Sequence, residues 1–174
     1  MAFITELDYN INNDELLTIF EPYPKKDDQL TINNRGDDLD PDAQLHCGIG
    51  GLQNWYEIKS YEDIQDKDFH WYKLNDYFVN TYMQEVYEKI QEDYFIGRSR
   101  VMTMWPGKCY SFHHDFSKRL HIPLKTNELC KFIDKDWNFH HLPSGKAYLV
   151  DTTQKHTAAN FSTLDRTHIV MAVK

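Results

Sequence analysis

Hydrophobic residues recur at steps of three and four over residues 74–94, and at steps of two after Gly97. In the first stretch the apolar positions are separated by glutamates and a lysine, so the pattern predicts one amphipathic helix that is ended by Gly97. The apolar positions are Phe78, Tyr82, Met83, Val86 and Ile90. We expect this face to pack on a sheet, because a methionine and aromatic stripe is usually a packing surface.

Period-two alternation in the last part of the chain predicts short strands that are separated by turn signals. The expected strands are residues 98–104, 120–125, 130–133, 146–151 and 167–173. Because no helical pattern lies between them, an antiparallel arrangement is favoured over a parallel sheet. We therefore expect a mainly β fold with a double-stranded β-helix core, that is, a cupin-like jelly roll, and an amphipathic helix covering one face.

The N-terminal part of the chain has short apolar pieces interrupted by Asn, Asp, Gly and Pro. A helix is expected from Asn13 to near Pro22, and the polar, turn-rich residues 33–44 are expected to form a surface loop. The length of 174 residues suits one domain. We expect residues 1–174 to form a single domain, with an irregular and helical support region over 1–97 and the jelly-roll core over 98–174.

Composition and charge narrow the classes of protein to consider. The chain is 41% hydrophobic and 14% aromatic, which is typical of a globular protein. Its formal net charge of -8 disfavours general nucleic-acid binding. No apolar stretch approaches the roughly 20 residues of a membrane span, and no export signal is recognised at the N-terminus. The oligomeric state does not follow from the sequence.

The three cysteines have no CxxC spacing, so neither a disulfide framework nor a zinc knuckle is indicated. Reduced thiols fit a cytoplasmic protein. The Asn-, Lys- and Ile-rich composition is compatible with a bacterial or phage gene, so the expected location is the cytoplasm of a bacterium or of a phage-infected cell.

Candidate chemistry begins with an H-x-D pair, His113 and Asp115. In extended chain, residues two apart project to one side, so these two can converge while His114 points away, unless a bulge exchanges the histidines. A third ligand is available in His156, 43 residues further on. Two imidazoles and one carboxylate on one octahedral face suit Fe(II), and they leave positions open for a bidentate co-substrate and oxygen.

Arg166 follows His156 by ten residues and opens the last expected strand. A guanidinium binds a carboxylate through two parallel hydrogen bonds, which Lys cannot match. An inward charge in a barrel needs a partner, and a dicarboxylic co-substrate would supply one. The alternative is a salt bridge to an acidic side chain such as Asp165.

The ordered set of motifs resembles the aspartyl/asparaginyl β-hydroxylase-like branch of the 2-oxoglutarate oxygenases, which also includes free-proline cis-hydroxylases. The motifs are the H-x-D pair, Arg119-x-His121, the run LPSGKAY over residues 142–148, Asp151-x4-His156-x3-Asn160, and Asp165-Arg166. The resemblance covers roughly residues 98 to 174, whereas the N-terminal 73 residues add little to it.

The resemblance implies a cofactor set and a role for each matching residue. It implies that His113, Asp115 and His156 are the Fe(II) ligands. It further implies that Arg166 binds the distal carboxylate of the co-substrate 2-oxoglutarate, and that Arg119 and His121 help to hold it. The animal β-hydroxylases have a small residue where this chain has Asp115, so the chain looks closer to bacterial and viral members and to the proline hydroxylases.

The expected function is therefore that of an Fe(II)- and 2-oxoglutarate-dependent dioxygenase. It would use O2 to hydroxylate an unactivated C–H bond of an amino acid such as Asp, Asn or Pro, free or within a peptide or protein. One alternative is a cupin-like metal-binding barrel with a non-oxidative lyase or isomerase activity or a ligand-binding role. Another is that His113, Asp115 and His156 lie apart and are ordinary polar residues.

Other polar residues have less specific interpretations. His140 is a candidate for the mouth of the site, His141 is expected in a polar turn, and His168 shares a strand face with Arg166 by alternation. Substrate contacts are expected from the loops and the N-terminal region. The available but unspecific side chains are Arg35, Gln44, Arg100 and Trp105.

Overall fold

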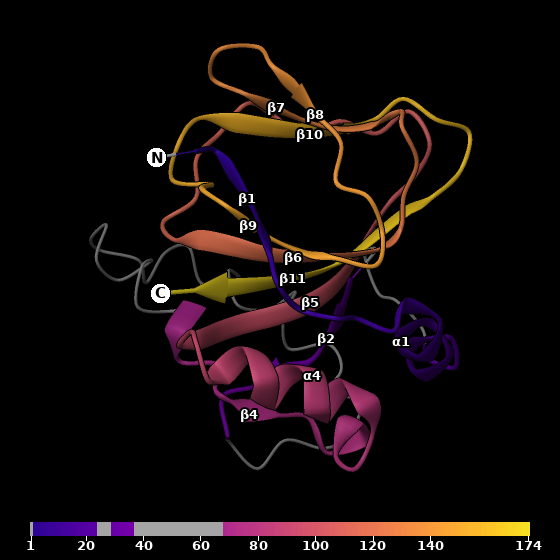
Figure 1. Ribbon diagram of the computed structural model, residues 1–174, viewed down its shortest axis with the longest axis vertical. Helices are drawn as coiled ribbons and strands as arrows, with labels where there is room; N and C mark the ends of the chain where they lie inside the picture. The colour runs from indigo at the N-terminus through magenta and orange to yellow at the C-terminus, as the bar shows by residue number, and fades with distance from the viewer. Residues whose placement is uncertain (1, 24–28, 37–67) are drawn as a thin grey trace, which may run out of the picture.

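The computed structural model describes residues 2–23, 29–36 and 68–174, and its main feature is a pair of antiparallel sheets that face each other (Figure 1). The larger sheet consists of β1 (Ile4–Leu7), β2 (Gln29–Thr31), β5 (Ile96–Met104), β6 (Lys118–Lys125), β9 (Ala147–Val150) and β11 (Arg166–Val173). Their order is β1-β9-β6-β11-β5-β2. The smaller sheet has the order β10-β7-β8, from β7 (Cys130–Asp134), β8 (Phe139–His140) and β10 (His156–Asn160).

This arrangement confirms the prediction of a mainly β, antiparallel fold. All five predicted strands form, as β5, β6, β7, β9 and β11, with bounds that differ by at most two residues. Period-two alternation does not predict β10, because its sequence HTAAN has polar residues at both ends and two adjacent alanines, although all five residues are buried. β11 is buried along its whole length too, but its run of β-branched and apolar residues still predicts a strand.

The N-terminal region contributes edge strands to the larger sheet. β1 pairs with β9, and β2 pairs with β5. The loop predicted over residues 33–44 is wrong at its start, because Asn33 and Asn34 form the buried strand β3 (Asn33–Asn34), which pairs with β4 (Lys73–Leu74). The Asn33 side chain donates to the carbonyl of Gly97 at 2.8 Å, which satisfies its buried amide. Residues 37–44 lie outside the described residues.

The two predicted helices have different outcomes. The first is confirmed as α1 (Asn13–Phe20), whose first turn is capped by the Asn12 side chain. The second is shorter than the predicted 74–94 and comprises only α4 (Tyr82–Gln91), after the 3-10 turn η2 (Asp76–Phe78). Asn80 breaks the helix because it has the left-handed conformation, with φ 61°.

The pattern predicted that Gly97 ends the helix. This prediction is wrong, because Gly97 lies inside β5. A Cβ at this position would lie 2.4 Å from the carbonyl oxygen of Asp68, so only glycine permits this close approach. The contact brings Asp68 next to the strand that carries Arg98 and Arg100.

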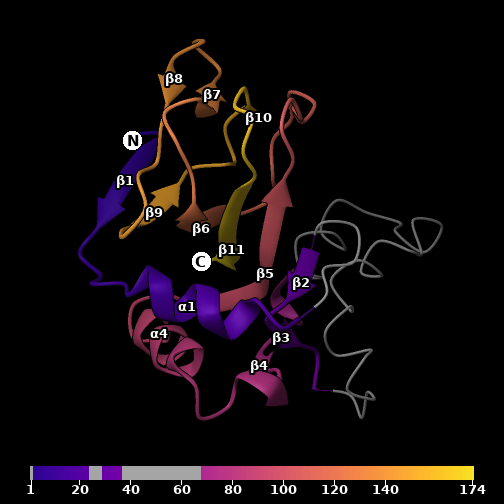
Figure 2. The same ribbon diagram turned by 90° about the vertical axis from the view of Figure 1, so that its right-hand side faces the viewer.

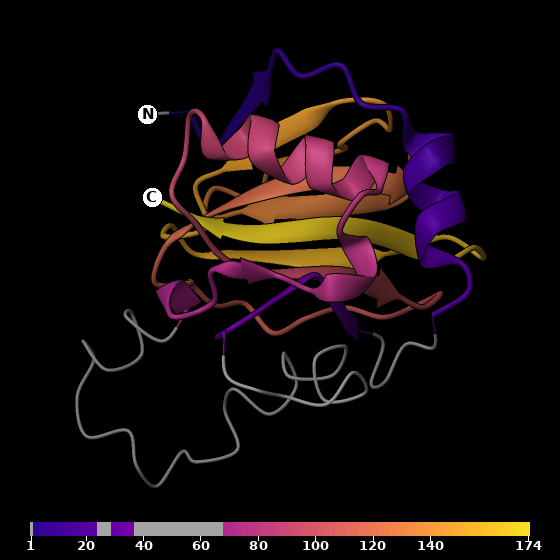
Figure 3. The same ribbon diagram turned by 90° about the horizontal axis from the view of Figure 1, so that it is seen from below.

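Two hydrophobic clusters lie on opposite faces of the larger sheet. The helices α1 and α4 cover the outer face (Figures 2 and 3), and Met83 and Ile90 of α4 share a buried cluster with Leu120 and Ile169 of the sheet. This confirms the predicted role of the amphipathic helix. A smaller cluster, which includes Phe132 of β7, lies between the two sheets. None of the helices in the described ranges is long and apolar enough to cross a membrane.

Alternation along β6 and β11 determines what faces the space between the sheets. Leu120 and Ile169 contact the helices, whereas Arg119, His121 and Arg166 line a cavity between the sheets. The strands thus present apolar residues to one side and candidate site residues to the other.

Candidate functional site

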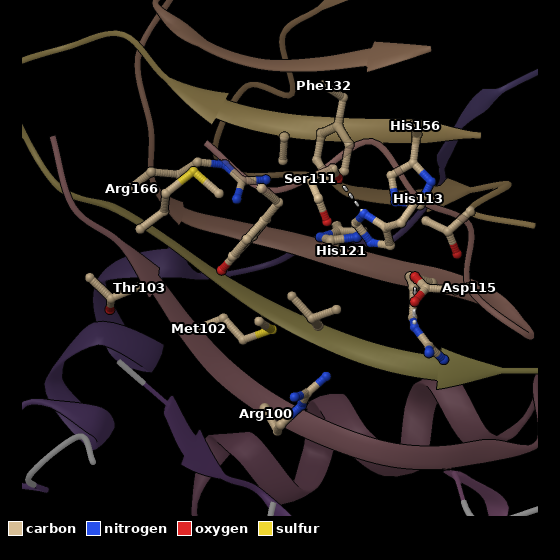
Figure 4. Close-up of a pocket in the computed structure, with 16 residues that line it drawn as sticks. Arg100, Met102, Thr103, Ser111, His113, Asp115, His121, Phe132, His156 and Arg166 are labelled. Atoms are coloured by element: carbon tan, nitrogen blue, oxygen red, sulfur yellow. Dashed lines mark hydrogen bonds and ion pairs between the residues drawn. The ribbon is translucent and has the colours of Figure 1, made fainter. Parts of the chain in front are cut away.

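One cavity of about 330 Å³ lies between the two sheets, and all six site residues predicted from the sequence line it (Figure 4). These residues are His113, Asp115, Arg119, His121, His156 and Arg166. Figure 4 shows the two histidines and Asp115 at one end of the cavity and Arg166 at the other.

Backbone pairing holds the three candidate metal ligands together. His113 and His156 exchange two backbone hydrogen bonds, at 2.9 and 2.7 Å, and the Asp115 amide donates to the Thr152 carbonyl at 2.8 Å. One ligand atom from each of His113, Asp115 and His156 lies within 4.8 Å of the other two. The alternative in which these residues lie apart is therefore wrong.

The same segments orient both imidazole rings. The Nδ1 atom of His113 lies 2.7 Å from the Ser111 carbonyl oxygen, and that of His156 lies 2.9 Å from the Gln154 carbonyl oxygen. A carbonyl only accepts, so each Nδ1 carries the proton and each Nε2 keeps a free lone pair. Burial lowers the pKa of His156 below its ordinary value, which favours the neutral form that a metal requires.

The other histidines near these ligands lie elsewhere. His114 is exposed and its ring lies 6.3 Å from that of Phe116, so no bulge exchanges it with His113. His140 bonds Asp134 at 2.8 Å and His141 lies 3.2 Å from Glu128. Neither His140 nor His141 is among the residues that line the cavity.

Arg166 is a buried cation, with 5% of its surface exposed. Its Nη2 atom donates to His168 Nδ1 at 3.1 Å, and its guanidinium lies 5.0 Å from the centre of the Phe132 ring. Within the described part of the chain no acidic side chain forms an ion pair with it. Burial lowers its pKa to about 10, so it stays charged at neutral pH.

Arg119 is surrounded by oxygen atoms of the protein. It contacts Asp68 at 2.7 Å and donates to Ser117 at 2.6 Å, and its Nε lies 3.4 Å from Asp115. Asp68 also pairs with Arg98 at 3.0 Å. Arg119 therefore links the candidate ligand Asp115 to a buried carboxylate, and these contacts orient the side chains at that end of the cavity.

Sequence reasoning did not identify Asp68, because it lies 51 residues before Arg119 in a region without a recognisable motif. Burial alone would raise the pKa of the Asp68 carboxyl, but Arg119 and Arg98 outweigh this and hold the pKa below its ordinary value. The carboxylate is therefore charged at neutral pH and compensates two guanidinium groups.

We expect Asp68→Asn to destabilise the protein by about 3 kcal/mol at pH 7, because it leaves two buried cations without their anion. The folded-state pKa of Asp68 is depressed, so its contribution is complete above the unfolded pKa of about 4 and is lost as the pH falls through the folded value. Urea unfolding of wild type and variant at pH 7 and pH 3 measures this difference, which should shrink at pH 3.

Asp76→Asn is the matched control, since the Asp76 side chain is 64% exposed in its pair with Lys73. Loss of an exposed pair should cost less than about 1 kcal/mol. Equal effects of the two variants would contradict the structural role of Asp68.

His121 and His168 form a neutral, buried pair of rings beside the cavity, with centroids 5.7 Å apart. Burial, with Arg166 nearby, holds the pKa of both imidazoles well below the ordinary value. Within the described residues His121 Nδ1 has no hydrogen-bond partner. Its ring lines the cavity, so it is available to a bound molecule as a neutral polar group.

Of the four side chains suggested from the sequence for substrate contacts, only one is found at the cavity within the described part of the chain. Arg100 lines the cavity. Arg35 is exposed and Trp105 is 49% exposed, and neither is among the lining residues. Gln44 lies outside the described residues.

Two solved structures resemble this one over its whole length. One is an oxidoreductase of the 2OG-Fe(II) oxygenase family from Burkholderia pseudomallei, with TM-score 0.56, 12% identity, and coverage of 99% of this chain and 84% of that one. The other is the viral collagen prolyl hydroxylase of Paramecium Bursaria Chlorella virus-1 in complex with 2OG, with TM-score 0.53, 11% identity, and coverage of 99% and 95%. At these identities the likeness concerns the fold, and it confirms the predicted double-stranded β-helix.

Comparison of the sequence with family models identifies the family, which the likeness of folds alone does not. A model of the family described as aspartyl/asparaginyl beta-hydroxylase matches residues 53–174, which is more than two thirds of the chain. The match includes every motif on which the resemblance in the sequence rested. The protein therefore belongs to the aspartyl/asparaginyl β-hydroxylase family and is an enzyme of the 2-oxoglutarate- and Fe(II)-dependent oxygenase type.

Proposed function

We propose that this protein is a dioxygenase that uses Fe(II), 2-oxoglutarate and O2 to hydroxylate an unactivated C–H bond of an amino acid, free or within a peptide or protein. The observation that carries the proposal is the convergence of His113, Asp115 and His156 at one end of the cavity that has Arg166 at its other end. A cytoplasmic location stays a prediction from the sequence.

The donor set supports Fe(II) as the metal. Two imidazole Nε2 atoms and one carboxylate are the ligands of a facial triad, a geometry that leaves three coordination positions open. The hydrogen bonds from each Nδ1 to a backbone carbonyl hold the rings of His113 and His156 in the ligating tautomer. The Nε atom of Arg119 lies 3.4 Å from the Asp115 carboxylate and orients it.

Charge supports a dicarboxylate as the co-substrate. The guanidinium of Arg166 is buried and charged, and its neighbours in the structure are the neutral ring of His168 and the face of Phe132. A carboxylate bound here would remove the cost of an uncompensated buried cation. The neutral ring of His121, which lies between the two ends in Figure 4, would contact the middle of the bound molecule.

Bound Fe(II) and 2-oxoglutarate would supply the chemistry that activates O2 for insertion into a C–H bond. The residues of this chain would position the reactants and exclude water. Phe132, Met102 and Ala158 give the cavity an apolar surface, which favours a dry site and shields the reacting atoms.

The test is an anaerobic titration of the apoprotein, first with Fe(II) and then with 2-oxoglutarate, followed through the weak visible absorption band of the metal chelate. We expect the band to appear and to saturate at one equivalent of 2-oxoglutarate. Glutarate, which has both carboxylates but no keto group, is the matched control and should give no band while competing with 2-oxoglutarate.

A wild-type protein that binds Fe(II) but never gives the band would contradict the proposal. In that case the alternative of a cupin-like metal-binding barrel with a non-oxidative activity would explain the site better. A band without substrate-stimulated succinate formation, across a broad panel of amino acids and peptides, would instead contradict the proposed substrate class.

A further inference from the structure

Arg100 extends from β5 into the same cavity, at a position separate from both the histidines and Arg166 (Figure 4). Its neighbours across the sheet are Val170 of β11 and Thr31 of β2. One guanidinium nitrogen, Nη1, donates to the side-chain oxygen of Gln29 at 2.6 Å. The direct hydrogen-bond partner of this cation is therefore a neutral amide.

Among the described residues, Asp68 and Asp115 act on the charge of Arg100 only from a distance, and neither forms a direct ion pair with it. Its buried Nε atom has no hydrogen-bond partner there, and none of the acidic side chains in these ranges forms an ion pair with it. Burial, together with the nearby Arg98 and Arg119, lowers the pKa of Arg100 to about 9, at which it is still charged at neutral pH. A partly buried cation without an anion is costly unless a ligand supplies one.

The other two guanidinium groups of the cavity already have an assignment. Arg119 contacts Asp68 and Asp115. Arg166 would bind the distal carboxylate of 2-oxoglutarate in the proposed function. Because Arg166 pairs with Met104, Arg100 lies four residues, or about 13 Å, further along β5. Arg100 is therefore available to a second anionic molecule.

We propose that Arg100 binds a carboxylate of the substrate, so that the enzyme acts on a small molecule or chain end that carries a free carboxylate beside an apolar body. This inference rests on the proposed function and deepens it. Met102 and Val170, which also line the cavity, would contact the apolar part. A free amino acid, a C-terminal residue or an acidic side chain fits this description, whereas an internal neutral residue of a peptide does not.

The experiment compares wild type with Arg100→Met by calorimetric titration, on the metal-free protein and on the anaerobic Fe(II)–2-oxoglutarate complex. The probes are matched pairs that differ only in a carboxylate: L-proline with L-prolinamide, and N-acetyl-L-aspartate with N-acetyl-L-asparagine. We expect wild type to prefer at least one carboxylate over its amide by about 30-fold or more, and the variant to lose this preference.

Two further variants separate this role from a structural one. Arg100→Lys keeps the charge but not the planar fork, so it should lose less of the preference than Arg100→Met. Arg35→Met removes an exposed arginine outside the cavity and should behave as wild type. The melting temperature of Arg100→Met should equal or exceed that of wild type, because the substitution removes a partly buried cation that has no direct ion pair and whose Nε lacks a hydrogen-bond partner.

The possible outcomes of these titrations either support or contradict the proposed role of Arg100. A wild type that shows no carboxylate preference with any probe pair, or an Arg100→Met variant that keeps the preference, overturns the inference. A variant that instead loses affinity for 2-oxoglutarate, measured through the chelate band, would assign Arg100 to the co-substrate and also overturn it. If no band forms in wild type but carboxylates still bind through Arg100, the proposed function fails, and with it the assignment of the bound molecule as an oxygenase substrate, whereas the carboxylate site at Arg100 is confirmed.

Discussion

Arg166→Met should raise the 2-oxoglutarate concentration needed to half-saturate the Fe(II) complex by about 100-fold, while Fe(II) affinity stays within about threefold. The substitution removes a charge-assisted, two-point contact, and a change of about 3 kcal/mol is typical for such a pair in a buried site. The chelate band, titrated without oxygen, measures both affinities in one experiment. The side chain lies at the far end of the cavity from the metal ligands, which is why the two affinities should separate.

Arg166→Lys is the informative control, because lysine keeps the positive charge but presents a single ammonium in place of a planar fork. We expect it to lose about tenfold in 2-oxoglutarate affinity, between wild type and the methionine variant. Thermal unfolding of each variant checks that the packing on Phe132 and His168 survives. Unchanged 2-oxoglutarate affinity in a folded Arg166→Met protein would show that the co-substrate binds elsewhere.

Local patterns predicted which side chains come together at this cavity, because these residues lie two apart along extended chain. The H-x-D spacing places His113 and Asp115 on one side of the segment, as the period of two requires, and the exposed His114 on the other. Alternation along β11 likewise places Arg166 and His168 on the same face, where they form a hydrogen bond. Such relations depend on neighbouring residues only, so the sequence is sufficient to show them.

The partners of these residues depend on long-range pairing that no local pattern encodes. Asp68 reaches Arg119 across 51 residues of chain, through a close approach that the absence of a side chain at Gly97 permits. The strand β10, which carries His156, has the sequence HTAAN, in which neither alternation nor a run of β-branched residues indicates a strand. Arg100 could be named as an inward arginine only once the sheet was known.

The predicted helix over residues 74–94 failed for a related reason. Phe78 and the residues of α4 contribute to one buried cluster, so their spacing mimics a single helix. The left-handed Asn80 separates the 3-10 turn from α4, and Phe78 reaches the cluster from outside that helix. Hydrophobic periodicity thus predicted correctly that these residues are buried, but it did not predict where the backbone changes direction.

Neighbouring histidines provide the sharpest test of the metal site. His113→Ala should lower affinity for Co(II), a spectroscopic stand-in for Fe(II), by more than the 10- to 100-fold that is typical for loss of a partner that only supports a ligand. His114→Ala should leave the affinity within about threefold, because that ring is exposed and contacts Phe116 instead. Equilibrium titration of the visible Co(II) bands measures both.

The melting temperature provides an independent test of the roles of His113 and His114. Excess Co(II) should raise the melting temperature of wild type and of His114→Ala, because the folded state alone brings the three ligands together. It should leave His113→Ala almost unchanged, although the metal-free forms of all three proteins should melt at similar temperatures. Stabilisation of His113→Ala equal to that of wild type would mean that the metal binds without the H-x-D pair. The facial triad would then be the wrong description of this cavity.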